Sequence, residues 1–207
     1  MPQVFVGRTD IQSDIWLNNI TFRKGEKYLI EAASGTGKSS LCSYLLGYRN
    51  DYRGSIKFDQ AEISNFSIGL WTDIRQHSLS MLFQELRLFP ELTALENIEL
   101  KNEINHQPFR SKEEIDGWFE AFGISDKRNQ KIGRMSFGQQ QRVAFIRALC
   151  QPTDFILMDE PVSHLDTKNG TIMRDILNKE AQKNGMGIIV TSIGHHIDMN
   201  YDKVIKL

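Results

Sequence analysis

Cysteine, net charge and long apolar runs are all scarce in this chain of 207 residues. Its two cysteines, Cys42 and Cys150, lie far apart and form no metal-binding or redox spacing, which excludes a disulfide scaffold and favours a reducing compartment. The net charge is −1, so binding to nucleic acid through a broad basic field is not expected. No run reaches the ~18–20 apolar residues of a membrane span. What remains is a globular protein, 40% hydrophobic.

Short apolar runs alternate with amphipathic stretches along the chain. This pattern predicts an α/β fold with a mostly parallel sheet, an antiparallel β edge and helices on both faces. The expected strands are 15–22, 27–32, 55–58, 78–83, 154–158, 187–191 and 203–207. The expected helices are 37–47, 68–75, 92–101, 112–122, 138–150 and 166–184. Ser111 and Glu114 have the spacing of a capping box at the start of the fourth helix.

Residues 85–135 depart from this alternation. Charged clusters and helical patterns fill the stretch, and no apolar run in it has the character of a buried strand. We therefore predict one unit over 1–207, with an α/β core formed by 1–84 and 136–207 and a helical insertion at about 85–135.

A glycine-rich turn lies between the second expected strand and the first expected helix. Gly35 and Gly37 allow backbone angles that direct successive N–H groups to one point at the positive end of a helix. Lys38 can reach the β- and γ-phosphates of a nucleotide, and the Ser39 hydroxyl can bind Mg²⁺. The strict phosphate-loop pattern has glycine at position 32, where this chain has alanine. The predicted phosphate-binding residues are Ser34, Gly35, Thr36, Gly37, Lys38, Ser39 and Ser40, so the sequence predicts a nucleoside triphosphate site on a P-loop NTPase core.

Two acids end the expected strand 154–158. An acid at the carboxyl end of a strand beside a phosphate loop can hold Mg²⁺, and a second can deprotonate an attacking water. Asp159 is therefore the candidate metal carboxylate and Glu160 the candidate base. Taken alone, Asp159-Glu160-Pro161 is equally compatible with a turn that ends a strand.

Together these motifs resemble the ATP-binding subunit of an ABC transporter. Residues 135–144, MSFGQQQRVA, are similar to the family's Leu-Ser-Gly-Gly-Gln signature at the start of a helix, and they supply Ser136, Phe137, Gly138 and Gln139. Gln84 matches the Q-loop, and Ser163 to Asp166 match the D-loop. The resemblance covers 5–207, and it places a helical subdomain where the insertion is predicted.

The resemblance implies a function and a set of partners. ATP and Mg²⁺ would bind at the interface of a head-to-tail dimer, with a pair of identical chains as the expected form. Each ATP would lie between one phosphate loop and the other subunit's signature. Gln84 would join Ser39 and Asp159 around Mg²⁺ and sense the γ-phosphate, and Asp166 would act in the D-loop. Hydrolysis would drive a separate integral membrane permease, which would place the chain in the cytoplasm, on the inner face of the cell membrane.

Two departures from the family concern the dimer face. Phe137 stands where the signature has glycine, and a ring is accommodated there if it points away from the phosphate. His164 stands where the D-loop has a small residue, and it is compatible with a solvated interface histidine.

A third departure concerns hydrolysis. The family has a histidine after the strand 187–190 that contacts the γ-phosphate, and the aligned residue here is Ser192. Serine carries no positive charge, so either the switch is impaired or compensated, or His195 or His196 folds back into the role. We favour the first alternative. No carboxylate or cysteine spacing makes a metal site of these two histidines.

The family also has an aromatic residue that stacks on adenine. Phe5 is the candidate, and an apolar residue of an edge strand is the alternative. Stacking contributes about 1–3 kcal/mol, so ATP binding does not depend on it.

Residues 86–98 resemble the ATPases of the lipoprotein-releasing and macrolide-exporting branch. Leu88, Phe89 and Leu92 either line a groove for a helix of the permease or pack inside the helical subdomain. Two other functions remain open: a nucleotide-gated binding module with weak hydrolysis, which Ser192 favours, and a soluble ABC ATPase without a permease.

Overall fold

A five-stranded parallel sheet forms the centre of the molecule. The structure is a computed structural model that describes residues 1–7, 12–33 and 35–207. The strand order is β4-β5-β6-β1-β7, and every neighbouring pair is parallel. The strands are β1 (Lys27–Glu31), β4 (Leu79–Leu82), β5 (Phe155–Asp159), β6 (Gly187–Ser192) and β7 (Lys203–Lys206). A separate antiparallel pair, β2 (Lys57–Phe58) and β3 (Ala61–Glu62), supplies the predicted antiparallel edge.

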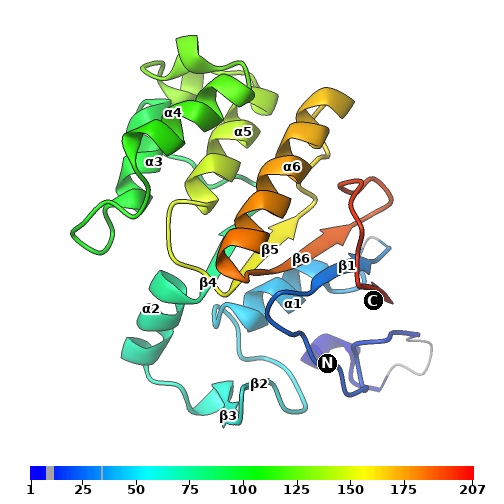
Figure 1. Ribbon diagram of the computed structural model, residues 1–207. Helices are drawn as coiled ribbons and strands as arrows, with labels where there is room; N and C mark the ends of the chain where they lie inside the picture. Colours follow the sequence, from blue (N-terminus) through cyan, green and yellow to red (C-terminus); the bar gives the residue numbers. More distant parts are fainter. Residues whose placement is uncertain (8–11, 34) are drawn as a thin grey trace.

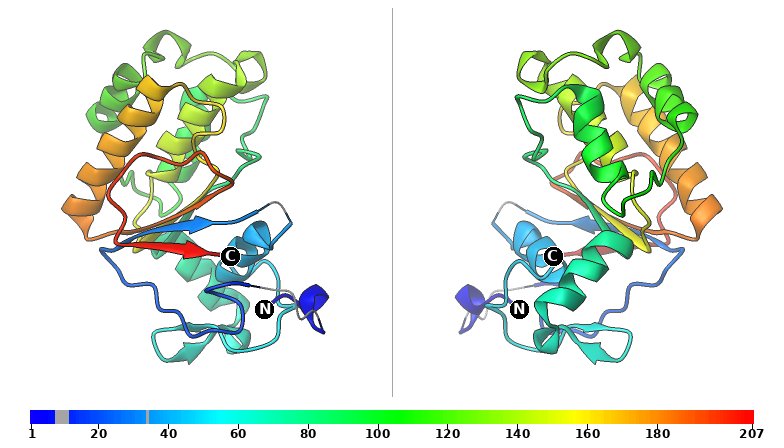
Figure 2. Two further views of the ribbon diagram at one scale, coloured as in Figure 1. Left: turned by 90° about the vertical axis from the view of Figure 1, so that its right-hand side faces the viewer. Right: turned by 90° about the vertical axis from the view of Figure 1, so that its left-hand side faces the viewer.

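Helices cover both faces of the sheet, so the protein has three layers (Figures 1 and 2). One face carries α3 (Ala94–Asn102), α4 (Lys112–Ala121), α5 (Phe137–Ala148) and α6 (Thr167–Asn184). The other face carries α1 (Lys38–Leu45) and α2 (Ile68–His77). Short 3-10 helices lie at Gln3–Phe5, Ile63–Asn65, Ser125–Lys127 and Ile132–Arg134. The predicted α/β fold is confirmed.

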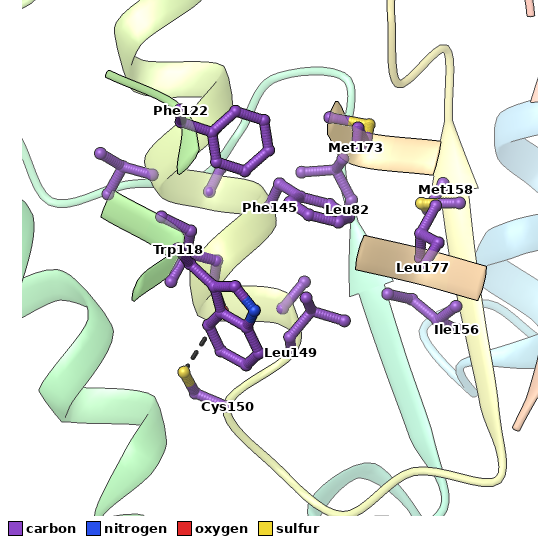
Figure 3. Packing of buried hydrophobic residues seen from close by; sticks show 14 of the residues in the cluster. Leu82, Trp118, Phe122, Phe145, Leu149, Cys150, Ile156, Met158, Met173 and Leu177 are labelled. Carbon is purple, nitrogen blue, oxygen red and sulfur yellow. Dashed lines mark hydrogen bonds between the residues drawn. The ribbon is translucent and has the colours of Figure 1, made fainter. Parts of the chain in front are cut away.

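Each face of the sheet has its own hydrophobic cluster. The larger cluster joins β4, β5 and β6 to the helices α3 to α6, with Phe145 and Ile156 fully buried in it (Figure 3). The second cluster joins the opposite face to α1 and the N-terminal segment. Burial of one large apolar side chain contributes about 1.5–3 kcal/mol, so both clusters hold the sheet in place. Cys42 and Cys150 are free and buried in different clusters, as the absence of a disulfide pattern predicted.

Side-chain caps begin several of the helices. Ser111 and Glu114 form the predicted capping box of α4, in which the serine hydroxyl accepts from the Glu114 N–H and the glutamate accepts from the Ser111 N–H. Thr93 and Ser136 begin α3 and α5 in the same way. Each such cap contributes about 1 kcal/mol, so these helices begin at defined residues.

The expected strand 15–22 is wrong. The Ser13 hydroxyl accepts hydrogen bonds from the N–H groups of Ile15 and Trp16, and the Asn18 N–H donates to the Ile15 carbonyl. Leu17 has φ = 67°. Local side-chain hydrogen bonds and a left-handed residue thus turn the backbone here, and they override the apolar alternation that predicted a strand.

The region 85–135 has the helical character that its sequence predicted. It contains α3, α4 and two of the 3-10 helices, and no named strand in the described part of the chain. A single antiparallel bridge joins Thr93 to Lys131. Helix α3 packs on α5, which in turn packs on β4, so this region rests on the parallel sheet. Among the described residues, no helix combines the length and the apolarity needed to cross a membrane.

Candidate nucleotide site

The phosphate loop connects the carboxyl end of β1 to the N-terminus of α1. Gly35 and Gly37 have φ of 81° and 103°, which an L side chain rarely adopts, and Gly37 is the N-cap of α1. Ala32 has no positive φ, so the alanine in place of the usual glycine causes no backbone strain. Gly35 to Ser40 thus form the turn that the sequence predicted, while Ser34 lies outside the described residues.

The aromatic rings of Phe5 and Trp16 pack against the backbone of this loop. The Trp16 indole Nε1–H donates to the Thr36 carbonyl at 3.1 Å. A Cβ on Gly37 would lie 3.2 Å from both the Phe5 ring and the Trp16 ring, so both rings touch the loop backbone. Phe5 is only 9% exposed, and its stacking on adenine stays a prediction. The support from Trp16 was missed, because residues 15–22 were expected to form a strand.

Lys38 and Glu160 meet across the site. The Lys38 side chain is 8% exposed, and its Nζ lies 3.8 Å from Glu160 Oε1 and 3.4 Å from the Ala33 carbonyl. Gln84 Nε2 lies 3.4 Å from the other oxygen of Glu160. Glu160 has φ = 50°, a conformation that costs a non-glycine residue about 1–2 kcal/mol. Strain of this kind clusters at functional sites, and here it coincides with the convergence of three predicted residues.

Asp159 lies beside the phosphate loop at the carboxyl end of β5. Its carboxylate is buried, and it accepts a hydrogen bond from Thr191 and a long one, at 3.4 Å, from Ser39 Oγ. A hydroxyl and a carboxylate are oxygen donors of the type that Mg²⁺ prefers, so the residues present fit this ion. Thr191, which fixes the carboxylate, was not singled out from the sequence, although its place at the end of the neighbouring strand could have indicated it.

The signature residues form the first turn of α5. The exposed Ser136 is the N-cap, and its hydroxyl accepts from the Gln139 N–H while Gln139 Oε1 accepts from the Ser136 N–H. The Phe137 ring contacts the His164 ring. Within the described part of the chain, no hydrogen bond or ion pair joins residues 136–139 to residues 35–40. The signature and the phosphate loop are therefore separate features of one subunit.

Asp166 of the D-loop caps α6. Its carboxylate accepts from the Asn169 N–H at 2.8 Å, and this hydrogen bond holds the pKa of Asp166 below its usual value. The aspartate is exposed, so its position relative to α6 is fixed while its outer side faces solvent.

Ser192 ends β6 and is fully buried. Its hydroxyl donates to the His195 carbonyl at 2.6 Å, across a turn in which Gly194 has φ = 112°. The side chains of His195 and His196 are exposed, and the His196 ring contacts Tyr201. The Ser192 hydroxyl at the switch position thus donates its hydrogen bond within its own turn, to the His195 carbonyl.

A hollow on the surface, here called the groove, lies between the α1–α2 layer and the helical region. Its volume is about 360 Å³, and it is lined by Leu46, Tyr48, Arg75, Leu79, Ser80, Met81, Phe83, Phe89, Asn97, Leu100, Lys101, Arg147 and Ala148. Phe89 lines this groove, which agrees with the first of the two alternatives given for residues 88, 89 and 92. Leu88 instead packs against the larger cluster, and Leu92 does not line the groove. For all three residues the choice between a groove for the permease and packing inside the helical subdomain stays a prediction.

Comparison with known proteins identifies the class to which this fold and site belong. Residues 17–163 match the ABC transporter family, so the chain belongs to that family. Its parallel sheet, helical region and phosphate loop are those of an ABC ATPase cassette.

Individual relatives agree with this assignment. The uncharacterized ABC transporter ATP-binding protein YclH of Bacillus subtilis is 37% identical over 78% of this chain and 73% of its own length. The lipoprotein-releasing system ATP-binding protein LolD of Geobacter metallireducens is 29% identical over 97% of this chain and 88% of its own length. The bacterial cassette MJ0796, in a dimeric structure, superposes with a TM-score of 0.81 at 29% identity, over 91% of this chain and 84% of that one. A second structure of MJ0796 contains ADP and Pi after hydrolysis.

Proposed function

We propose that this chain binds ATP and hydrolyses it at the interface of a dimer of identical chains, and that it drives a separate membrane permease. The observation that carries the proposal is that polar atoms of Lys38 and Gln84 each lie within 4 Å of the Glu160 carboxylate, next to the Ser39–Asp159 pair. These five residues supply a phosphate ligand, a base and three metal donors. The division into a core of 1–84 and 136–207 and a helical subdomain of 85–135 belongs to the same proposal.

Each residue has a defined part in the phosphoryl transfer. The backbone N–H groups of residues 35–40 and the Lys38 ammonium hold the β- and γ-phosphates. Glu160 accepts the proton of the attacking water as the water oxygen bonds to the γ-phosphorus and the bond to the β-phosphate oxygen breaks. Gln84, which touches Glu160, orients that water.

Ser39, Asp159 and Gln84 would hold Mg²⁺. When bound, the ion neutralises charge that develops on the phosphate oxygens. The Thr191 hydroxyl keeps the Asp159 carboxylate turned toward the loop, which is a positioning role.

The second subunit completes the site. Ser136, Gly138 and Gln139 at the positive end of α5 suit the γ-phosphate of ATP that is bound to the other chain, and Asp166 lies in the D-loop of the same face. The dimeric structure of MJ0796 supports this arrangement. In this chain the Phe137 ring lies against the His164 ring. In the proposed dimer we expect this contact to keep the Phe137 ring away from the phosphate.

The groove is the proposed docking site of the permease, which would hold the protein at the inner face of the cell membrane. It combines the exposed apolar side chains of Phe89 and Leu100 with the cations Arg75, Lys101 and Arg147. Its lining, as far as the chain is described, contains no carboxylate. These properties suit an amphipathic helix with acidic residues on its contact face. Co-purification of the chain with a membrane fraction of its own cells, lost in Lys101→Glu, tests the docking.

The Glu160→Gln variant tests the assignment of the base. Loss of a general base lowers turnover by about 100- to 10,000-fold, and the variant retains ATP and accumulates as a dimer. Phosphate release and sedimentation in ATP measure the two effects. Glu91→Gln, an exposed carboxylate outside the site, is the matched control. Unchanged turnover in Glu160→Gln removes Glu160 from the mechanism.

The geometry of Ser192 favours a second candidate, a nucleotide-gated binding module with weak hydrolysis. The buried Ser192 hydroxyl is used in its bond to His195, so it contributes nothing to a γ-phosphate. Steady-state phosphate release with and without Ser192→His separates the candidates. Robust release by the unmodified chain excludes the weak module, and a strong gain in Ser192→His supports it.

A further inference from the structure

Two unusual residues of the dimer face lie against each other. The ring centroids of Phe137 and His164 are 4.5 Å apart, and the planes meet at 71°, an edge-to-face arrangement. Phe137 is 42% exposed, and His164 is exposed. In the ABC pattern these are the positions of a glycine and of a small residue, so the two departures form one contact. An edge-to-face pair is an attractive geometry for aromatic rings.

The backbones beneath the two rings are also closely packed. A Cβ on Gly138 would lie 3.1 Å from the His164 carbonyl oxygen, so a larger residue here would require the D-loop backbone to shift by a few tenths of an ångström. One turn further along α5, Gln141 Nε2 donates to the Pro161 carbonyl at 2.7 Å in the buried interior. The start of α5 is thus attached to the segment that directly follows Glu160.

A charge interaction continues the same seam. Asp166 acts on Arg142, where it opposes the lowering of the arginine's pKa that burial causes. From Phe137 to Arg142, α5 therefore interacts with the D-loop through a ring pair, a close backbone approach and a charge, and with the segment before the D-loop through an amide. Both rings of the pair are exposed, so solvent or a second subunit can reach this contact.

We propose that Phe137 and His164 are positioning residues that together fix the signature turn to the D-loop and present both to the second subunit as one surface. The inference rests on the proposed function, since it requires the nucleotide-dependent dimer. Because the ring of Phe137 is held on His164, Ser136 and Gly138 stay uncovered for the partner's nucleotide. Removing either ring frees the other to lie over that surface, so each single loss is harmful and the second adds little.

A double-mutant cycle tests this coupling. In the Glu160→Gln background, sedimentation in ATP gives the dimer dissociation constant for Phe137→Ala, His164→Ala and the double variant. We expect each single substitution to weaken the dimer by about five- to tenfold, and the double variant to be no weaker than the worse single one. His164→Phe keeps a ring on Phe137 and is expected to retain most of the affinity. Phe109→Ala removes a ring of similar exposure outside this face and serves as the control.

Two further measurements separate positioning from a general loss of structure. Nucleotide affinity of the isolated subunit should not change in these variants, while the protein concentration that gives half-maximal phosphate release, measured with Glu160 intact, should rise. Additive effects on the dimer, or weaker binding of nucleotide by the subunit alone, overturn the positioning role. If the Glu160→Gln parent forms no dimer with ATP, the proposed function fails first and the inference falls with it, and the parent alone reveals this result.

Discussion

The nucleotide site and the groove differ in how their charges are satisfied. In the nucleotide site, Lys38 faces Glu160, and the buried Asp159 accepts from two hydroxyls. In the groove, Lys101 and Arg147 are partly buried beside each other, and no ion pair to a described carboxylate involves either of them. Burial lowers the pKa of Arg147 to about 10, and burial together with Arg147 lowers that of Lys101 to about 8.

This difference distinguishes a site that is complete for its ligand from one that lacks a partner. A buried cation without a counter-charge is costly, and an arriving carboxylate recovers that cost. In the nucleotide site each of these charged groups already has a polar partner, and the substrate exchanges one set of partners for another. Substitutions in the first region should therefore remove activity, whereas substitutions in the second should mainly change stability and docking.

Among the substitutions that compare the two regions, the largest effect is expected in the nucleotide site, with Asp159→Asn. The amide keeps the shape but loses the negative charge that the metal requires, so ATP turnover should fall by about 100-fold or more. Phosphate release measures the loss. Asp154→Asn is the matched control, because Asp154 precedes the same strand and pairs with the exposed Lys24. Turnover of Asp159→Asn within about threefold of the parent would show that the two regions do not differ as described.

The local part of this site was predictable from the sequence. A strand, a glycine turn and a helix follow one another directly at residues 27–45, and the two acids follow their own strand, so sequence spacing alone determines their geometry. The contact of Phe137 with His164 was not predictable, since it depends on how α5 packs against a loop of another segment. The groove is a long-range feature for the same reason: its lining comes from α2, β4, α3, α5 and the segments that follow α1 and β4.

The features that were not predicted also have physical causes. Residues 15–22 were expected to form a strand because their apolar residues alternate. They form a turn instead, because the Ser13 hydroxyl accepts local hydrogen bonds and Leu17 is left-handed. Leu88 and Leu92 follow the same apolar pattern as Phe89, but only Phe89 reaches the groove. Side-chain pattern predicts burial, and it does not predict which surface a residue of an irregular segment will face.

A smaller effect is expected from Arg147, which links the groove to the Q-loop. Its guanidinium donates to the carbonyls of Leu86 and Arg87, each at 2.7 Å. These two residues follow Gln84 closely, and both have left-handed backbones, with φ of 59° and 48°. Arg147→Met removes both hydrogen bonds, so the free energy of unfolding should fall by about 2–3 kcal/mol.

Thermal and denaturant unfolding measure this loss, and phosphate release shows whether the turn also positions Gln84. Arg147→Lys keeps the charge without the planar fork, and it should recover only part of the stability. Arg75→Met is the control within the same groove, because Arg75 makes one longer bond, at 3.3 Å, to the Leu46 carbonyl. Equal losses in Arg147→Met and Arg75→Met would mean that the strained turn has no special dependence on Arg147.

The smallest effect has the opposite sign. Lys101→Met should stabilise the isolated chain at pH 7 by about 1 kcal/mol, since it removes a partly buried cation that has no described counter-charge. The pKa of Lys101 is about 8 in the folded chain and about 10.4 in the unfolded one. Between these values the unfolded state holds more protons, so the parent gains stability as the pH rises from about 8 to about 10.4.

The advantage of Lys101→Met should therefore be complete below pH 8 and shrink above it, in unfolding experiments at a series of pH values. Lys112→Met, at an exposed position on α4, should show no such trend. Lys101→Met should also weaken binding to the permease, because the Lys101 cation that destabilises the free chain is the one that an acidic helix would pair with. A variant that is more stable alone and binds the permease equally well would contradict the comparison, since it would show that the groove has no use for this unpaired charge.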